Sequence, residues 1–165
     1  MNSYRNSPMP ASALVVAYPG KVVAYDPTSG HERWSYEARR QPLRGKRPTK
    51  VAVTDDRVYL LTQHVQDGGF MGSPRTTVEL VALNYATGDV LWTQVVDRGE
   101  LLPYFWMALV VKGDLVFVAH ADVIVAIDPA TGAIRWCREV DRVAALALPG
   151  CVDDGPVAPA PVRHG

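Results

Sequence analysis

The stretch DPTSGHERW, residues 26–34, returns twice further along the chain, as NYATGDVLW at residues 84–92 and as DPATGAIRW at residues 128–136. Each copy follows a short apolar run in which alanine is the next-to-last residue. Internal repeats of strand-like units at a spacing of about 20–50 residues are typical of propellers and solenoids. The repeat therefore predicts a modular all-β architecture for this 165-residue chain.

Each copy of the repeat predicts a strand, a tight turn and a second strand. The Asp or Asn side chain that starts the copy can accept a backbone N–H two residues later, and the glycine supplies a positive φ without steric cost. The tryptophan on the second strand is expected to pack as a wedge between neighbouring sheets, and the alternative is stacking on a ligand. The repeat residues are Asp26, Gly30, Trp34, Asn84, Gly88, Trp92, Asp128, Gly132 and Trp136.

Valine-rich runs precede each copy and predict further short strands, so that a full unit has four antiparallel strands, here A to D. Three such units, or blades, are expected at about residues 12–38, 49–96 and 104–140. Residues 1–11 contain no apolar run, so the first blade is expected to lack its innermost strand A, and this segment is expected to be disordered.

The pattern apolar-Ala-apolar-Asp/Asn-x-x-Thr/Ser-Gly-x-x-x-Trp resembles the repeat of the pyrroloquinoline-quinone-type, or quinoprotein dehydrogenase-like, β-propellers and their tryptophan-docking motif. The resemblance covers roughly residues 12–140. Ser29 stands where threonine is usual, and Asn84 stands where aspartate is usual. The resemblance implies a propeller of four-stranded blades, from a family that contains quinone-dependent dehydrogenases, bacterial assembly lipoproteins and scaffold domains.

The same resemblance gives no catalytic residue for this chain. The enzymes of the family carry an adjacent cysteine pair and a set of Glu, Asn and Asp around calcium and quinone, and no position here matches either. The only two cysteines, Cys137 and Cys151, are far apart, and the four histidines show no metal-binding spacing. Fold alone does not establish function. We therefore expect a non-enzymatic protein without a metal or cofactor.

Three blades are fewer than the four to eight that usually close a propeller. Two copies related by two-fold symmetry would supply six blades and a closed ring. An apolar run at about residues 143–150 could then complete the first blade of the partner, which would make residues 12–150 half of a propeller. We expect a homodimer that exchanges this closing strand. The alternative is closure against a different protein, and residues 151–165 are expected to form a flexible tail.

The B–C and D–A connections of such blades share one face of the ring, and the longest connections of this chain, 38–49, 65–77 and 97–103, all belong to that face. Long loops on a rigid scaffold are where binding usually occurs. The first is basic and could contact an acidic partner or remain a solvated loop. The apolar residues near the other two could contact a ligand or pack on the ring. The candidate binding residues are Arg39, Arg40, Arg44, Lys46, Arg47, Phe70, Met71, Arg75, Tyr104 and Trp106.

Overall charge argues against a dedicated nucleic-acid binder, because 17 basic residues balance 17 acidic ones. No run approaches the ~20 apolar residues of a membrane-spanning helix, and no signal peptide is apparent, so we expect a cytoplasmic protein. The sequence predicts a scaffold for protein–protein interaction through the long-loop face. Binding of a small ligand or sugar at the channel mouth is the alternative, and a quinone-dependent oxidoreductase assembled at a dimer axis is a third.

Overall fold

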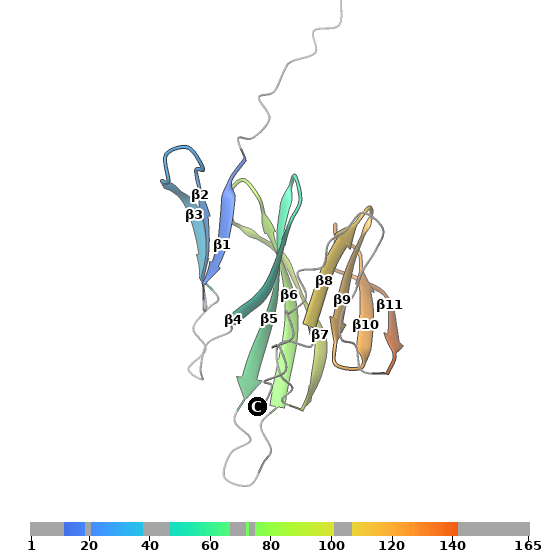
Figure 1. The fold of residues 1–165 in the computed structure, drawn as a ribbon. Helices are drawn as coiled ribbons and strands as arrows, with labels where there is room; N and C mark the ends of the chain where they lie inside the picture. The colour runs from blue at the N-terminus through green and yellow to red at the C-terminus, as the bar shows by residue number, and fades with distance from the viewer. Residues whose placement is uncertain are drawn as a thin grey trace, which may run out of the picture.

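The computed structural model of the chain describes residues 12–18, 21–37, 47–66, 72, 75–100 and 107–141. These residues form three antiparallel β-sheets that follow one another in an open arc (Figure 1). The all-β, propeller-type prediction is confirmed. Among the described residues, no helix is long and apolar enough to cross a membrane.

Each sheet corresponds to one predicted blade, with its strands in sequence order. The first consists of β1 (Leu14–Tyr18), β2 (Lys21–Tyr25) and β3 (Glu32–Glu37). The second consists of β4 (Arg47–Val53), β5 (Arg57–Gln66), β6 (Arg75–Asn84) and β7 (Val90–Glu100). The third consists of β8 (Met107–Lys112), β9 (Leu115–His120), β10 (Val123–Ile127) and β11 (Ile134–Glu139). Within the described ranges the first sheet has strands B to D only, and the closing strand predicted at residues 143–150 lies outside these ranges.

The second sheet is longer than the sequence predicted. Residues 65–77 and 97–103 were expected to be loops, but Gln66 pairs with Arg75, and Arg75 pairs in turn with Glu100. The loop prediction was therefore wrong for the residues of these segments that lie in β5, β6 and β7. The β-branched side chains there favour extended backbone, and Thr76 is buried in the sheet.

The repeated turns have the predicted geometry. Asp26 Oδ1 accepts the backbone N–H groups of Thr28 at 2.9 Å and Ser29 at 3.0 Å, and Asn84 and Asp128 accept the equivalent pairs. The glycine of every copy has a positive φ: 71° at Gly30, 77° at Gly88 and 76° at Gly132. The substitutions of Ser29 and Asn84 for the usual residues leave the turn intact.

Two layers of apolar side chains hold the three sheets together. Between the first and second sheets, Val22, Ala24 and Trp34 pack on Val58 and Leu83. Between the second and third sheets lies a larger cluster, whose members are Tyr59, Leu61, Val78, Leu80, Ala82, Met107, Leu109, Val116, Val118, Val125 and Ile127. The arc is therefore a stack of sheets in which neighbouring sheets share a dry interior.

The strands place the long connections on one side of the arc, as predicted. Strands B and D run in the same direction in an antiparallel sheet, so Glu37, Gln66 and Glu100, the last residues of β3, β5 and β7, lie toward the same side. The short A–B and C–D turns lie on the other side, where the Tyr85 N–H donates to the Asp56 carbonyl at 3.0 Å.

Candidate interaction surface

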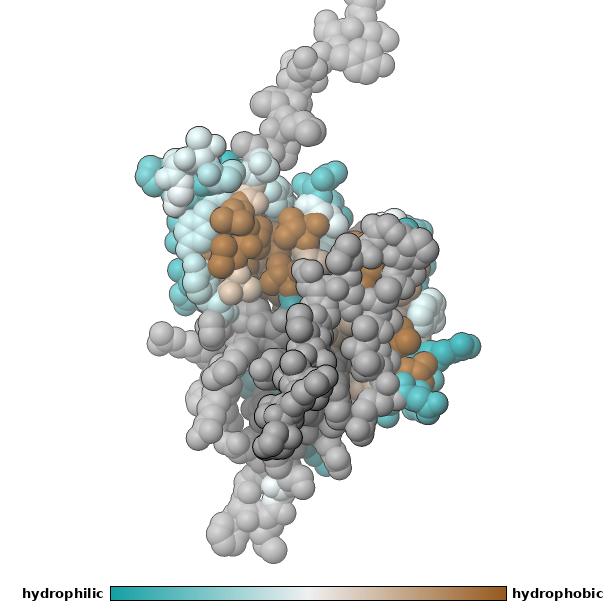
Figure 2. All heavy atoms as spheres, viewed as in Figure 1, coloured by the Kyte–Doolittle hydropathy of each residue, from teal (hydrophilic) through white to brown (hydrophobic). Residues whose placement is uncertain are grey.

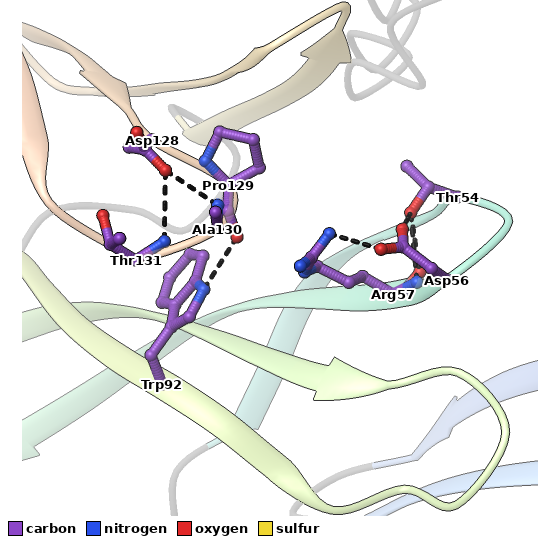
Figure 3. Close-up of polar contacts among 8 residues, drawn as sticks. All are labelled: Thr54, Asp56, Arg57, Trp92, Asp128, Pro129, Ala130 and Thr131. Atoms are coloured by element: carbon purple, nitrogen blue, oxygen red, sulfur yellow. Dashed lines mark hydrogen bonds and ion pairs between the residues drawn. The ribbon is translucent and has the colours of Figure 1, made fainter.

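The tryptophan of one sheet reaches the turn of the next sheet. Trp34 donates its indole N–H to the carbonyl of Tyr85 at 2.8 Å, and Trp92 donates to the carbonyl of Pro129 at 2.9 Å (Figure 3). Tyr85 and Pro129 are the second residues of the repeated turns. In every sheet the tryptophan pairs across the ladder with the alanine that the sequence repeat places before the turn. The contact between sheets is therefore a repeated unit.

The indole rings also occupy the space beside the turn glycines. A Cβ atom on Gly88 would lie 2.6 Å from Cε3 of Trp34, and one on Gly132 would lie 2.7 Å from Cε3 of Trp92. No side chain fits at such distances, so glycine is required here for space as well as for its φ. Sequence analysis found the conformational reason for glycine but missed the steric one.

The third tryptophan does not make this contact. Trp34 is only 7% exposed, whereas Trp136 is 44% exposed, and its indole N–H has no acceptor among the described residues. Trp136 contacts Phe117 of its own sheet, with ring centroids 6.0 Å apart. Packing between sheets is therefore found for Trp34 and Trp92, and it stays a prediction for Trp136, because no described sheet follows the third one.

The opposite end of the arc is open in a complementary way. Leu14 occupies the position in strand B that Val58 and Val116 occupy in the other two sheets, since the three pair with Tyr25, Leu83 and Ile127. Val58 and Val116 are 0% exposed, but Leu14 is 57% exposed. A Cβ atom on Gly30 would have no atom within 4 Å. The first sheet thus has, at Gly30 and Leu14, a turn and an apolar position that no described residue of another sheet covers.

Both open ends carry apolar surface. Leu14 and Tyr18 are exposed on the first sheet, and Ile134 and Trp136 are exposed on β11. In Figure 2, apolar surface gathers at the upper left over β1 and the adjoining part of the second sheet, and a smaller apolar area lies at the right-hand edge over the third sheet. Apolar surface at two sheet ends is a typical location for protein contact.

Arginine side chains brace the turns of the first and third sheets. Arg33 forms an ion pair with Asp26 at 2.6 Å, and Arg135 pairs with Asp128. The hydrogen bond from Arg33, together with the backbone N–H groups of Ser29 and Thr28, holds the pKa of Asp26 well below its ordinary value. The hydrogen bond from Arg135 likewise lowers the pKa of Asp128. Both carboxylates are therefore charged at neutral pH and act as acceptors in their turns.

A buried histidine joins the second and third sheets near the long-loop side. His120 is 2% exposed, and its Nδ1 lies 2.6 Å from Oδ2 of Asp97. An ionised carboxylate only accepts hydrogen bonds, so Nδ1 carries the proton and donates it. Nε2 of His120 and Nδ1 of His64 are buried without a hydrogen-bond partner. The sequence gave no signal for the contact between His120 and the carboxylate of Asp97.

Most of the predicted binding residues stay predictions. Arg75, on β6, is described and exposed, and it pairs across the sheet with Gln66 at the long-loop side. Arg47 begins β4, but the orientation of its side chain is not described. The other candidates lie outside the described residues: Arg39, Arg40, Arg44, Lys46, Phe70, Met71, Tyr104 and Trp106. Within the described part of the chain, no group of three or more His, Cys, Asp or Glu residues could hold a metal ion.

Comparison with known proteins gives a family and a fold. Residues 5–146 match the family described as outer membrane protein assembly factor BamB. No curated protein matches the chain in sequence. The crystal structure of BamB from Moraxella catarrhalis matches with a TM-score of 0.53 and 23% identity over 79% of this chain and 34% of that chain. The chain thus spans about a third of the BamB structure that it matches.

Two further solved structures match less well. The computationally designed Ika8 protein has a TM-score of 0.38 and 16% identity, over 82% of this chain and 49% of that chain. Quinohemoprotein alcohol dehydrogenase from Comamonas testosteroni has a TM-score of 0.30 and 14% identity, over 80% of this chain and 34% of that chain. At these identities the likeness to solved structures concerns the fold alone.

Proposed function

The chain belongs to the BamB-like family of PQQ-repeat β-propellers, and from this membership we propose that it is a non-enzymatic scaffold that binds a protein partner through its long-loop face. The observation that carries the proposal is the common side on which β3, β5 and β7 end. Three long connections leave a rigid stack of sheets at that side, and binding residues concentrate on loops held in this way.

Positive charge on the long-loop face indicates what kind of protein partner would bind there. The connection between β3 and β4 contains Arg39, Arg40, Arg44 and Lys46, and the exposed Arg75 lies at the same side. The chain has no net charge, so this local cluster of cations would attract an acidic surface of a partner protein to this face. We propose an acidic protein segment as the occupant of this face.

The test is affinity capture from a cell extract, with the wild type compared with a variant in which Arg39, Arg40, Arg44, Lys46 and Arg47 are replaced by serine. A captured protein whose recovery falls strongly in the variant, and falls with added salt in the wild type, would support the proposal. A control variant, Lys112→Ser with Arg138→Ser, removes exposed cations of β8 and β11 and is expected to leave recovery unchanged. Equal recovery by all three proteins would contradict the role of the basic loop.

Binding of a small ligand at the channel mouth is the second candidate. It is favoured by His120, whose buried Nε2 has no hydrogen-bond partner among the described residues and lies near the long-loop side. An unpartnered ring nitrogen of this kind would suit a hydroxyl of a sugar-like ligand, because a hydroxyl can both donate and accept a hydrogen bond. Titration of the protein with a panel of sugars, followed by the nitrogen-15 resonances of His120, tests this function. No change in these resonances with any sugar would count against it.

A further inference from the structure

The described residues contain two complete copies of one contact and the two halves of a third. In the complete copies, an indole lies beside the turn glycine of the next sheet and donates to the carbonyl of the second turn residue. The unused indole is Trp136, and the unused turn is the one that contains Pro27 and Gly30. These halves lie at opposite ends of the arc.

The two unused halves match each other in detail. Trp92 uses the carbonyl of Pro129 in the turn DPATG, and the open turn of the first sheet reads DPTSG, with Pro27 at the same position. Gly30 has the same left-handed backbone as Gly132, with φ of 71° and 76°. No atom lies within 4 Å of a Cβ placed on Gly30, whereas a Cβ on Gly132 would collide with Trp92. The open turn therefore has the geometry of an acceptor that lacks its indole.

The apolar faces behind these residues match in the same way. Ile127 and Val116 of the third sheet are buried against the second sheet, and Tyr25 and Leu14 hold the same register positions on the open face of the first. On the face of the third sheet that points away from the second sheet, Phe117 and Trp136 flank Ala126 as Tyr59 and Trp92 flank Ala82 in the second. Trp136 is the exposed member of this group, since Ala126 is 0% exposed. The open faces thus repeat the two sides of an interface that the chain already forms.

We propose that a second copy of this chain docks on these ends, with Trp136 of each copy donating to the Pro27 carbonyl of the other and lying over its Gly30. The two contacts are related by a two-fold axis, so the pairing closes and does not grow into a filament. Two sets of three sheets make six, which is within the range of closed propellers. The inference is independent of the long-loop face and extends the proposed function to self-assembly.

A second copy suits this site better than an unrelated protein because one association covers both ends. A different partner would have to imitate the repeat turn at one end and the tryptophan face at the other. The exposed side chains central to the two contacts, Leu14 and Trp136, are apolar, and the charges nearest the open turn, Asp26 and Arg33, neutralise each other. The centre of each contact would therefore bury little unpaired charge.

The test is the molar mass of the full chain in solution, measured by sedimentation over a wide concentration range. The wild type is expected to be a dimer. Trp136→Ala and Leu14→Asp are each expected to raise the dimer dissociation constant by at least ~30-fold, because both residues would be central and dry in the dimer. Both are exposed in the single chain, so the variants should keep the β-sheet circular dichroism of the wild type. Leu91→Ala, an equally exposed apolar position in the middle sheet, is the matched control and should remain dimeric.

Mixing the two variants identifies the contact itself. Trp136→Ala keeps the first-sheet end intact, and Leu14→Asp keeps the tryptophan end intact, so a mixed pair has one complete contact and associates more tightly than either variant alone. A wild type that stays monomeric at all concentrations, or folded variants that dimerise like the wild type, would overturn the proposal. A monomer that still captures a partner through the basic loop would overturn only the self-assembly, and a dimer without loop-dependent capture would overturn only the scaffold function.

Discussion

The six-membered ring of Trp92 lies so close to Gly132 that a Cβ atom on this glycine would be 2.7 Å from Cδ2 and Cε3 of the indole. The same indole donates its N–H to Pro129, three residues earlier in the turn. One residue of the second sheet thus fixes both the spacing and the register of the third. The same contact recurs between Trp34 and Gly88. Neighbouring sheets are therefore joined by a repeated tryptophan–turn contact in addition to apolar burial.

Replacing Trp34 with alanine is expected to lower the free energy of unfolding by about 3–5 kcal/mol, because the change leaves a cavity between the first two sheets. Trp34→Phe should cost less, since it keeps most of the apolar contact and loses the hydrogen bond to Tyr85. Urea unfolding measures both changes. Leu91→Ala serves as the exposed control and should change stability by less than about 0.5 kcal/mol. Equal stability of Trp34→Ala and the control would show that packing of Trp34 between the sheets does not stabilise the protein.

Alanine at Gly88 is expected to destabilise the protein more than alanine at Gly30. Both changes place a Cβ on a residue with positive φ, which costs roughly 1 kcal/mol. Only Gly88 has an indole beside it, and displacing Trp34 should add about 1–3 kcal/mol. The comparison is made by urea unfolding in the Trp136→Ala background, in which no second copy can supply an indole to Gly30. Equal losses of unfolding free energy at the two glycines would mean that Trp34 moves away from the new Cβ without destabilising the protein.

Acid should weaken the first turn through Asp26. The pKa of this carboxyl is lowered in the folded protein by Arg33 and the turn amides, so its stabilising effect is fully present above the ordinary pKa of 3.8 and is lost as the pH falls below that value. Asp26→Asn should therefore be less stable than the wild type at neutral pH, and the difference should shrink below about pH 4. The second sheet already uses Asn84 at this position, so the variant should fold. Thermal unfolding of both proteins between pH 2 and 7, a range chosen to span that titration, measures the effect. A difference that does not vary with pH would exclude the carboxylate as its source.

The hydrogen bond between His120 and Asp97 should couple the second and third sheets. Asp97→Ala leaves the buried Nδ1–H of His120 without its acceptor, which costs about 1–3 kcal/mol. In a double-mutant cycle with His120→Phe, the loss from Asp97→Ala should become smaller, with a coupling energy of about 0.5–3 kcal/mol. Additive losses would show that the two side chains do not interact in solution.

The nine-residue repeat was enough to predict the blades, their turns and the order of their strands. These features are local: Asp26 accepts from amides two and three residues away, and Gly30 sets its own φ. The extension of β5 and β6 past His64 was not predicted, because the glycines and Pro74 that follow suggested an irregular loop throughout. Pairing of Val65 with Thr76 depends on the neighbouring strand, and the residues around Val65 in the sequence carry no information about that strand.

The candidate surface was predicted only in outline. The sequence placed the long connections on one side, and the strand directions agree with that placement. The hydrogen bond between His120 and the carboxylate of Asp97 was not predicted, because Asp97 was assigned to a loop. In the structure, Asp97 lies on β7 of the neighbouring sheet. No sequence pattern links residues that meet only when two sheets stack.

By itself, the sequence determined that this protein builds the same strand–turn–strand unit three times, since each turn is fixed by hydrogen bonds and backbone angles within a few residues. The tertiary structure decided which of three equivalent tryptophans find a partner. Trp34 and Trp92 are covered by a following sheet, whereas no sheet in the described part of the chain follows Trp136, which is 44% exposed. Burial depends on what lies across an interface, and three copies of one motif cannot differ in that respect until the sheets have stacked.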